Sequence, residues 1–138
     1  MATWKLTELS KKMKDLDICM LSTQGDDEIN SRPMSNNGDV EYDGNSFFFT
    51  SDKFTVAKEI EENNKVGLTF TGKDKLYIAV IGEADLINDK EEMEEHWTED
   101  LEKWFQDGVD TPDLVMIHVK ASTIRYWQGE EQGEISVN

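Results

Sequence analysis

The stretch that decides the fold is NSRPMSNNGDVEYDGNSFFFTSDKFTVAKEIEENNK, residues 30–65. It joins an extended segment containing Arg32 to an apolar run at residues 46–50 and then to a helix predicted to begin at Ser51-Asp52. A strand that ends in hydroxyl side chains and leads directly into a helix presents free backbone N–H groups. Together with the helix dipole, these N–H groups favour a bound phosphate. The stretch therefore predicts a ligand cradle.

Two turn clusters lie inside this stretch, at residues 36–39 (NNGD) and 42–45 (YDGN). The Asp-Gly pair of the second cluster is a strong hairpin signal. The run at residues 46–50 is predicted to be a strand that is apolar on both faces, as an inner strand of a closed barrel would be. The inward side of the following helix is expected to carry Phe54, Ala57 and Ile60.

The segments before the stretch predict one helix and one β-hairpin. Apolar residues recur every three or four positions over residues 4–16, which is typical of an amphipathic helix packed on a core. Two short segments, residues 17–24 and 29–34, flank a Gly-Asp-Asp turn and predict paired strands. Pro33 cannot donate to a ladder, so the second strand is expected to be an edge strand or a bulged one. Cys19, in the first strand, is expected to be a small buried hydrophobe.

The segments after the stretch predict further strands. They are expected at residues 66–71 and 76–87, and Gly82 in the longer strand indicates a bend or bulge that lets it serve both halves of a barrel. Residues 114–120 and 124–128 predict a closing strand pair.

A further helix is predicted to open at Asp89, with Glu92 three residues on as in a capping box. Its apolar side would carry Met93, Trp97, Leu101, Trp104 and Phe105. Glu92, His96 and Asp100 would form one column along it. Because no second histidine is nearby, a solvated acidic face is favoured over a metal site, and no metal ligand is assigned.

The composition predicts one folded domain over residues 1–128, followed by a mobile polar tail at residues 129–138. Of the 138 residues 37% are hydrophobic, including four Trp and six Phe, which excludes disorder. The net charge of −16 disfavours nucleic acids and anionic membrane surfaces as partners. A single cysteine, no signal-peptide core and no transmembrane run together indicate a soluble, cytoplasmic protein.

Four motifs, in this order and at this spacing, resemble the pyridoxamine 5'-phosphate oxidase-like split-barrel flavoproteins. They are SRPM (residues 31–34), FFFT (47–50), AKEI (57–60) and NNKV (63–66). Three more resemble the general stress protein branch of that superfamily: YIAVIGEA (77–84), WF (104–105) and PDL (112–114). The similarity covers nearly the whole chain. It implies a mainly β fold, a six- or seven-stranded antiparallel split β-barrel with flanking helices, which forms a homodimer and binds FMN noncovalently.

The resemblance also implies which residues contact FMN. The positions carried over are Arg32, Pro33, Met34, Ser35, Phe49, Thr50 and Tyr77. The strand beside the isoalloxazine ring and the ribityl chain is matched by residues 32–35. Phe49 and Thr50 match the next strand that contacts the flavin. Tyr77 falls where relatives often place a polar contact with the flavin. Judged from composition alone, Arg32 would be a solvated charge on an edge strand and not a flavin contact. On the resemblance, we expect Arg32→Ala to weaken flavin binding by about 1.5–3 kcal/mol and to leave the fold intact.

At the phosphate, the sequence departs from these relatives. Their basic pair that grips the phosphate falls here on Thr55 and Val56, so that a hydroxyl remains and two positive charges are lost. Lys53 or Lys58, together with Ser51 and Thr55, are the candidates to replace that pair, since a lysine acts as a movable point charge.

In this superfamily, aromatic side chains from the partner subunit lie near the flavin ring. The resemblance makes Trp104, Phe105 and Trp127 candidates for that role, with core packing as the alternative reading of each. For Trp104, core packing is favoured.

We expect an FMN-dependent oxidoreductase of unknown substrate, in which the flavin N5 accepts or donates hydride and no catalytic protein residue is identified.

The sequence has no motif of hydrolases, nucleotide triphosphatases or classical dinucleotide-binding proteins. It also lacks the arginine-rich C-terminal motif of true pyridoxamine phosphate oxidases, for which Arg125-Tyr126-Trp127 is the nearest candidate, so a vitamin B6 oxidase is not expected. Two alternatives stay open: a flavin-holding stress protein without turnover, and an acidic protein-interaction domain with an empty barrel.

Overall fold

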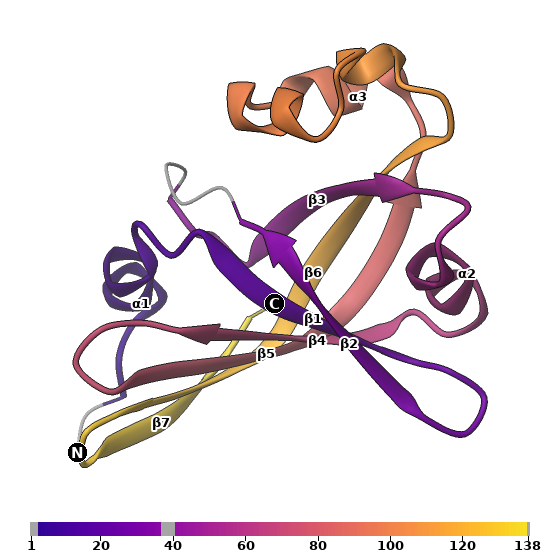
Figure 1. Ribbon diagram of the computed structural model, residues 1–138. Coiled ribbons are helices and arrows are strands. Elements are labelled where there is room, and N and C mark those ends of the chain that lie inside the picture. Colours follow the sequence, from indigo (N-terminus) through magenta and orange to yellow (C-terminus); the bar gives the residue numbers. More distant parts are fainter. Residues whose placement is uncertain (1–2, 37–40, 138) are drawn as a thin grey trace.

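An antiparallel sheet that curves into an open barrel dominates the computed structural model, which describes residues 3–36 and 41–137 (Figure 1). Its described strands are β1 (Ile18–Gln24), β2 (Ile29–Ser35), β3 (Asn45–Ser51), β4 (Lys65–Thr71), β5 (Leu76–Ile87), β6 (Leu114–Gln128) and β7 (Glu131–Ser136). The helices are α1 (Leu6–Met13), α2 (Thr55–Glu62) and α3 (Lys90–Glu95), with two short 3₁₀ helices, η1 (Glu99–Lys103) and η2 (Gly108–Asp110). The prediction of a mainly β, antiparallel split barrel is confirmed.

The barrel is split between β2 and β3, which are the two ends of the strand order β2-β1-β4-β5-β6-β3. Pro33 therefore lies on an edge strand, as predicted from its missing N–H. The hairpin predicted at Asp43-Gly44 is wrong, because β3 pairs with β6 over its whole length and not with β2. Gly44 still turns the chain, with a φ of 100°. Most of the other turn cluster, residues 37–39, lies outside the described residues.

The two long strands β5 and β6 connect the halves of the barrel. Along β6, the first residues pair with β3 and the last pair with β7, while β5 runs beside both parts. The register between them shifts where predicted: Ile81 lies opposite Thr123, but Gly82 lies opposite Ala121. The extra residue is Ser122, whose hydroxyl donates to the Ile81 carbonyl at 3.0 Å. This bulge lets one continuous strand turn from one half of the barrel to the other.

Two predictions about the C-terminal part of the chain are wrong. Residues 114–120 and 124–128 form one strand, β6, and not a pair. Residues 131–136 belong to β7 and not to a mobile tail. The N-terminal segment holds this region in place, because the Trp4 indole stacks on Tyr126 at 3.9 Å between ring centroids and donates to the Glu131 carboxylate at 2.9 Å.

The apolar side chains divide into two clusters on either side of β3. Phe48 points into the barrel, where the main core lies, and its neighbour Phe49 points into a second cluster beneath α3. This confirms the prediction of a strand apolar on both faces, although β3 ends the strand order at the split and is not an inner strand of a closed barrel. The main core includes Leu21, Phe48, Leu68, Ile78 and Ile117, and α1 and α2 lie at opposite ends of the barrel (Figure 1).

The helices begin and end at other residues than the pattern predicts. The second helix starts at Thr55 with Phe54 as its N-cap residue, and not at Ser51-Asp52. Phe54 was expected to face inward, but its side chain is 61% exposed. None of the helices in the described part of the chain is long and apolar enough to cross a membrane.

The helix predicted from Asp89 also ends early. Asp89 caps it as expected, accepting from the Glu91 N–H, but α3 stops at Glu95 and η1 follows. Glu92, His96 and Asp100 therefore do not form a helical column. Trp104, for which core packing was favoured, is 75% exposed.

Candidate functional site

A pocket of about 360 Å³ lies in the split of the barrel, where β2 and β3 meet the start of α2. We call it the seam pocket. It is lined by Arg32, Pro33, Met34, Thr50, Phe54, Thr55 and Val56. Five of these seven were predicted as site residues from the sequence, and they come from three elements: β2, β3 and α2.

Arg32 is held in the seam pocket by a network that the sequence did not predict. Its guanidinium donates to the Thr23 hydroxyl at 2.8 Å, to the Leu21 carbonyl at 3.3 Å and to the Glu59 carboxylate at 3.3 Å. The Arg32 side chain is 23% exposed and that of Glu59 only 9%. Glu59 also accepts from Thr23 and Asn30, each at 2.7 Å. Arg32 is therefore oriented by an ion pair and is not the solvated edge charge that composition alone favoured.

Glu59 is expected to make the stability of the fold depend on pH in the acid range. Hydrogen bonds from Thr23, then Asn30 and Arg32, lower the pKa of Glu59 below its ordinary value of 4.5, against an opposing effect of burial. A carboxyl group with a lowered folded-state pKa stabilises the fold above its unfolded-state pKa, and this stabilisation is lost as the pH falls through the folded-state pKa. We expect the free energy of unfolding to fall more steeply below about pH 4.5 in the parent protein than in Glu59→Gln.

Urea unfolding at a series of pH values measures this difference. Glu62→Gln, an exposed change on the same helix, serves as the control and should keep the acid dependence of the parent protein. Equal pH slopes for the parent protein and Glu59→Gln would contradict the prediction.

The start of α2 supplies backbone donors to the seam pocket. No side chain caps this helix, and no described residue accepts a hydrogen bond from the N–H groups of Thr55 or Val56. The Ser51 hydroxyl accepts instead from the Lys53 N–H at 3.2 Å. The free N–H groups predicted for the cradle therefore exist, but four residues later than the sequence indicated.

Neither lysine proposed to replace the missing basic pair lines the seam pocket. Lys53 is exposed and pairs with Asp113 at 3.0 Å. Lys58 lies on the exposed side of α2. Of the described residues that line the pocket, only Arg32 carries a positive charge.

The other predicted site residues lie outside the seam pocket of the single chain. They are Ser35, Phe49, Ser51, Lys58 and Tyr77. Phe49 packs in the second apolar cluster, and Ser35 is exposed at the end of β2. Tyr77 is 51% exposed on the outer face of β5, opposite Trp127 of β6.

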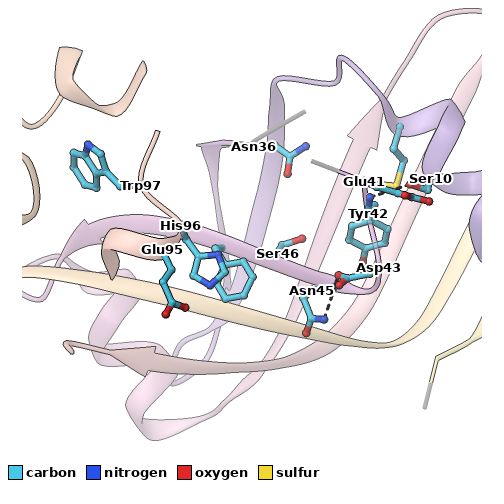
Figure 2. Close-up of a pocket in the computed structure, with 12 residues that line it drawn as sticks. Ser10, Asn36, Glu41, Tyr42, Asp43, Asn45, Ser46, Glu95, His96 and Trp97 are labelled. Carbon is cyan, nitrogen blue, oxygen red and sulfur yellow. Dashed lines mark hydrogen bonds between the residues drawn. The ribbon is translucent and has the colours of Figure 1, made fainter. Parts of the chain in front are cut away.

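A second pocket, of about 230 Å³, lies further along the same split (Figure 2). Its described lining comes from α1, the residue after β2, the segment that leads into β3, the first residues of β3, and the end of α3 with the two residues after it. These residues are Ser10, Met13, Asn36, Glu41, Tyr42, Asp43, Asn45, Ser46, Phe47, Glu95, His96 and Trp97. Sequence reasoning missed this pocket. Tyr42 and Asp43 were interpreted only as turn residues, and His96 only as part of a helical face.

Comparisons with known proteins agree with this architecture. The profile of the family described as "Pyridoxamine 5'-phosphate oxidase like" matches residues 5–137. General stress protein 26 of Bacillus subtilis (strain 168) is 33% identical over 101 residues, which cover 70% of this chain and 71% of that protein.

Two solved structures have the same fold. A protein related to general stress protein 26, from Clostridium acetobutylicum, superposes with a TM-score of 0.83 at 20% identity and covers 96% of this chain and 94% of its own. The general stress FMN/FAD binding protein of Xanthomonas citri superposes with a TM-score of 0.78 at 20% identity, with the same coverage. At these identities the likeness shows the split-barrel fold.

Proposed function

This chain belongs to the pyridoxamine 5'-phosphate oxidase-like family, and on that premise we propose that it binds FMN in the seam pocket. The observation that carries the proposal is the convergence of Arg32, Thr50 and Thr55 with the apolar residues of the β2 edge around one pocket. A protein of the same fold, from Xanthomonas citri, is by name an FMN/FAD binding protein, which supports a flavin as the guest.

The donors around the seam pocket fit a phosphate despite the lost basic pair. A guanidinium has five N–H donors, and three hydrogen bonds engage that of Arg32 with described residues, so two donors remain. The Thr55 and Val56 N–H groups and the Thr50 and Thr55 hydroxyls add further donors. We propose that these groups hold the phosphate through hydrogen bonds at the helix start.

The remaining lining suits the ring and its chain. Pro33, Met34 and Val56 offer apolar surface that excludes water, and the missing N–H of Pro33 leaves the β2 edge without a donor at that position. Bound FMN supplies hydride or electron transfer at its isoalloxazine ring. Apart from Arg32, no described lining residue of the seam pocket has an ionisable side chain, so the chain holds and orients the cofactor while the cofactor carries the chemistry.

We infer an FMN-dependent oxidoreductase, and the second candidate is a flavin-holding stress protein without turnover. The observation that favours the second is the same absence of an acid or base among the described lining residues of the seam pocket. The free, buried Cys19 supports a cytoplasmic location for either one.

The absorbance spectrum of the purified protein tests flavin binding. Flavin bands, or binding of added FMN at micromolar concentration, are the expected result. A colourless protein that ignores supplied FMN would reject both candidates in favour of an acidic interaction domain with an empty barrel. If the protein is yellow, steady-state oxidation of NADH or NADPH with a dye acceptor separates the oxidoreductase from the flavin holder.

We also propose a homodimer that forms through the outer face of the sheet. This face carries exposed apolar side chains on β1 and, beyond β4, on the neighbouring strands β5 and β6: Ile18, Met20, Tyr77, Ile81 and Trp127. An exposed apolar patch on a folded domain is typical of an interface. In such a dimer Tyr77 would make its predicted flavin contact in the partner subunit, which accounts for its position outside the seam pocket of its own chain.

Ile81→Glu is expected to convert the dimer to a monomer, because it places a carboxylate in the middle of this apolar face. It should also weaken FMN binding if Tyr77 acts across the interface. Light scattering after gel filtration measures the mass, and an FMN titration the affinity. Lys103→Glu, which adds a carboxylate at an exposed position of η1 away from the sheet, is the control. A monomeric parent protein, or a dimeric Ile81→Glu variant, would reject this interface.

A further inference from the structure

The positive charge in the seam pocket is already compensated by the protein itself. Arg32 is the charged residue of the described lining, and its guanidinium lies 3.3 Å from the Glu59 carboxylate. Both side chains are largely shielded from water. Salt and solvent therefore screen this ion pair much less than they would screen an exposed pair. Taken together, the two side chains bring no net charge to the pocket.

Glu59 keeps its negative charge at neutral pH. Its carboxylate accepts hydrogen bonds from the Thr23 hydroxyl and the Asn30 amide, each at 2.7 Å, in addition to the contact with Arg32. These bonds, that from Thr23 foremost, hold the pKa of Glu59 below its ordinary value of 4.5. The negative charge beside the guanidinium therefore opposes the attraction that Arg32 alone would exert on a phosphate.

No second cation is present in the described lining of the seam pocket. The lining residues at the start of α2 are Phe54, Thr55 and Val56, which are uncharged, and Lys53 just before them pairs with Asp113 at 3.0 Å. The phosphate of FMN has a second pKa of about 6 and carries close to two negative charges at pH 7. Its transfer from water into this pocket therefore lacks the charge pairing that would offset its loss of hydration.

The uncharged donors of the pocket suit an alcohol as well as a phosphate. They are the backbone N–H groups of Thr55 and Val56 and the hydroxyl groups of Thr50 and Thr55. A hydroxyl group can only donate to a phosphate dianion, whereas it can both donate to and accept from an alcohol. An uncharged hydrogen bond contributes only a modest net free energy. The pocket therefore gains little when a phosphate replaces the terminal hydroxyl of a ribityl chain.

We propose that Glu59 sets the ligand preference of the seam pocket: by cancelling the charge of Arg32, it makes the pocket bind riboflavin, the phosphate-free flavin, about as tightly as FMN. This inference rests on the proposed flavin function and names the parts of the flavin that are recognised, the ring and the ribityl chain. Glu59 lies outside the described lining and acts on the ligand through Arg32, so it is a positioning residue.

Fluorescence titrations of the purified full chain with FMN and with riboflavin give both dissociation constants, and their ratio measures the preference for the phosphate. The two constants are expected to lie within about tenfold of each other, which is the difference that one ordinary hydrogen bond makes. A larger preference for FMN would overturn this inference and leave the flavin function intact. Binding of neither flavin would reject the flavin function and this inference with it.

Two substitutions of Glu59 test its role. Glu59→Gln leaves the charge of Arg32 uncompensated, so the preference for FMN over riboflavin is expected to rise about tenfold or more. Glu59→Asp keeps the carboxylate and should keep the preference of the parent protein. A purely structural role of Glu59 would change the affinities for both flavins alike. An unchanged ratio of the two dissociation constants in Glu59→Gln would therefore overturn the assignment.

A positive charge added at the start of α2 tests the same argument without touching the Arg32–Glu59 pair. Thr55→Lys should raise the affinity for FMN about tenfold and leave the affinity for riboflavin near that of the parent protein. Glu61→Gln, which changes the net charge equally at an exposed position of α2 outside the lining, should change neither affinity. An equal gain in FMN affinity in both variants would trace the effect to the charge of the whole chain and overturn the local assignment.

Salt dependence gives an independent readout. In the parent protein the ratio of the two dissociation constants should change little between about 0.05 and 0.5 M NaCl, because there is no net charge pairing to screen. In Thr55→Lys the preference for FMN should fall as the salt concentration rises. A preference for FMN in the parent protein that disappears at high salt would reveal a pocket of net positive charge and overturn the inference.

Discussion

Arg32→Ala is expected to weaken FMN binding roughly ten- to hundredfold, by removing charge-assisted hydrogen bonds of about 1.5–3 kcal/mol, and to lower the free energy of unfolding as well. The sequence alone indicated that the fold would stay intact. The structure changes that expectation, because Arg32 is also the ionic partner of the nearly buried Glu59. Removing one partner leaves a carboxylate that only Thr23 and Asn30 stabilise.

The double variant Arg32→Ala/Glu59→Gln separates the two effects. A neutral amide at position 59 needs no cation, so stability should recover relative to Arg32→Ala, while FMN affinity should stay low. Urea unfolding gives the stability and fluorescence titration gives the affinity. If FMN affinity recovers together with stability, Arg32 acts on the flavin only through the fold. If Arg32→Ala binds FMN as tightly as the parent protein does, the Arg32 side chain does not contact the flavin.

Gly82→Ala is expected to destabilise the sheet strongly. A Cβ at this position would overlap the Lys120 carbonyl, with its carbon at 2.9 Å, and the obstacle is backbone that cannot rotate away. Overpacking of this kind costs about 1–3 kcal/mol, and occasionally more. The contact arises from the bulge, where Gly82 faces Ala121 across the shifted register. The midpoint of urea unfolding should fall accordingly.

Gly67→Ala is the matched control for this prediction. Gly67 also lies within a strand, but a Cβ there would meet only the Val80 carbonyl oxygen, at an ordinary 3.6 Å. Its unfolding midpoint should stay close to that of the parent protein. If Gly82→Ala and Gly67→Ala had the same urea-unfolding midpoint, the backbone at the bulge would be able to move apart without loss of stability. That result would contradict the prediction.

Local patterns predicted most of the strands, because alternation and turn chemistry act over a few residues. β1, β2, β4 and β5 lie within one or two residues of the predicted ranges. Pairing over long distances was not predictable in this way. The Asp43-Gly44 signal is satisfied by a local turn, and nothing nearby in the sequence shows that β3 pairs with residues 114–120. Likewise, β7 is too polar to be recognised as a strand until β6 supplies its partner.

The candidate site was only partly predictable for the same reason. Family motifs gave Arg32 and Thr50 because these positions match the motif residue by residue. Glu59 was quoted in a helical motif, but its inward position depends on contacts with β1 and β2 that helical spacing does not reveal. The second pocket is assembled from α1, the approach to β3 and α3, so no single stretch of sequence carries its pattern.

The threefold pairing of β6 has a consequence for synthesis. This strand completes ladders with β3, β5 and β7, so a nascent chain that has not yet emerged to residue 128 has β1, β2, β4 and β5 but no way to close the barrel. Non-local pairing of this kind slows folding to milliseconds or longer, and the unfinished half exposes strand edges and apolar surface that chaperones bind. Truncation anywhere within β6 should therefore yield insoluble protein.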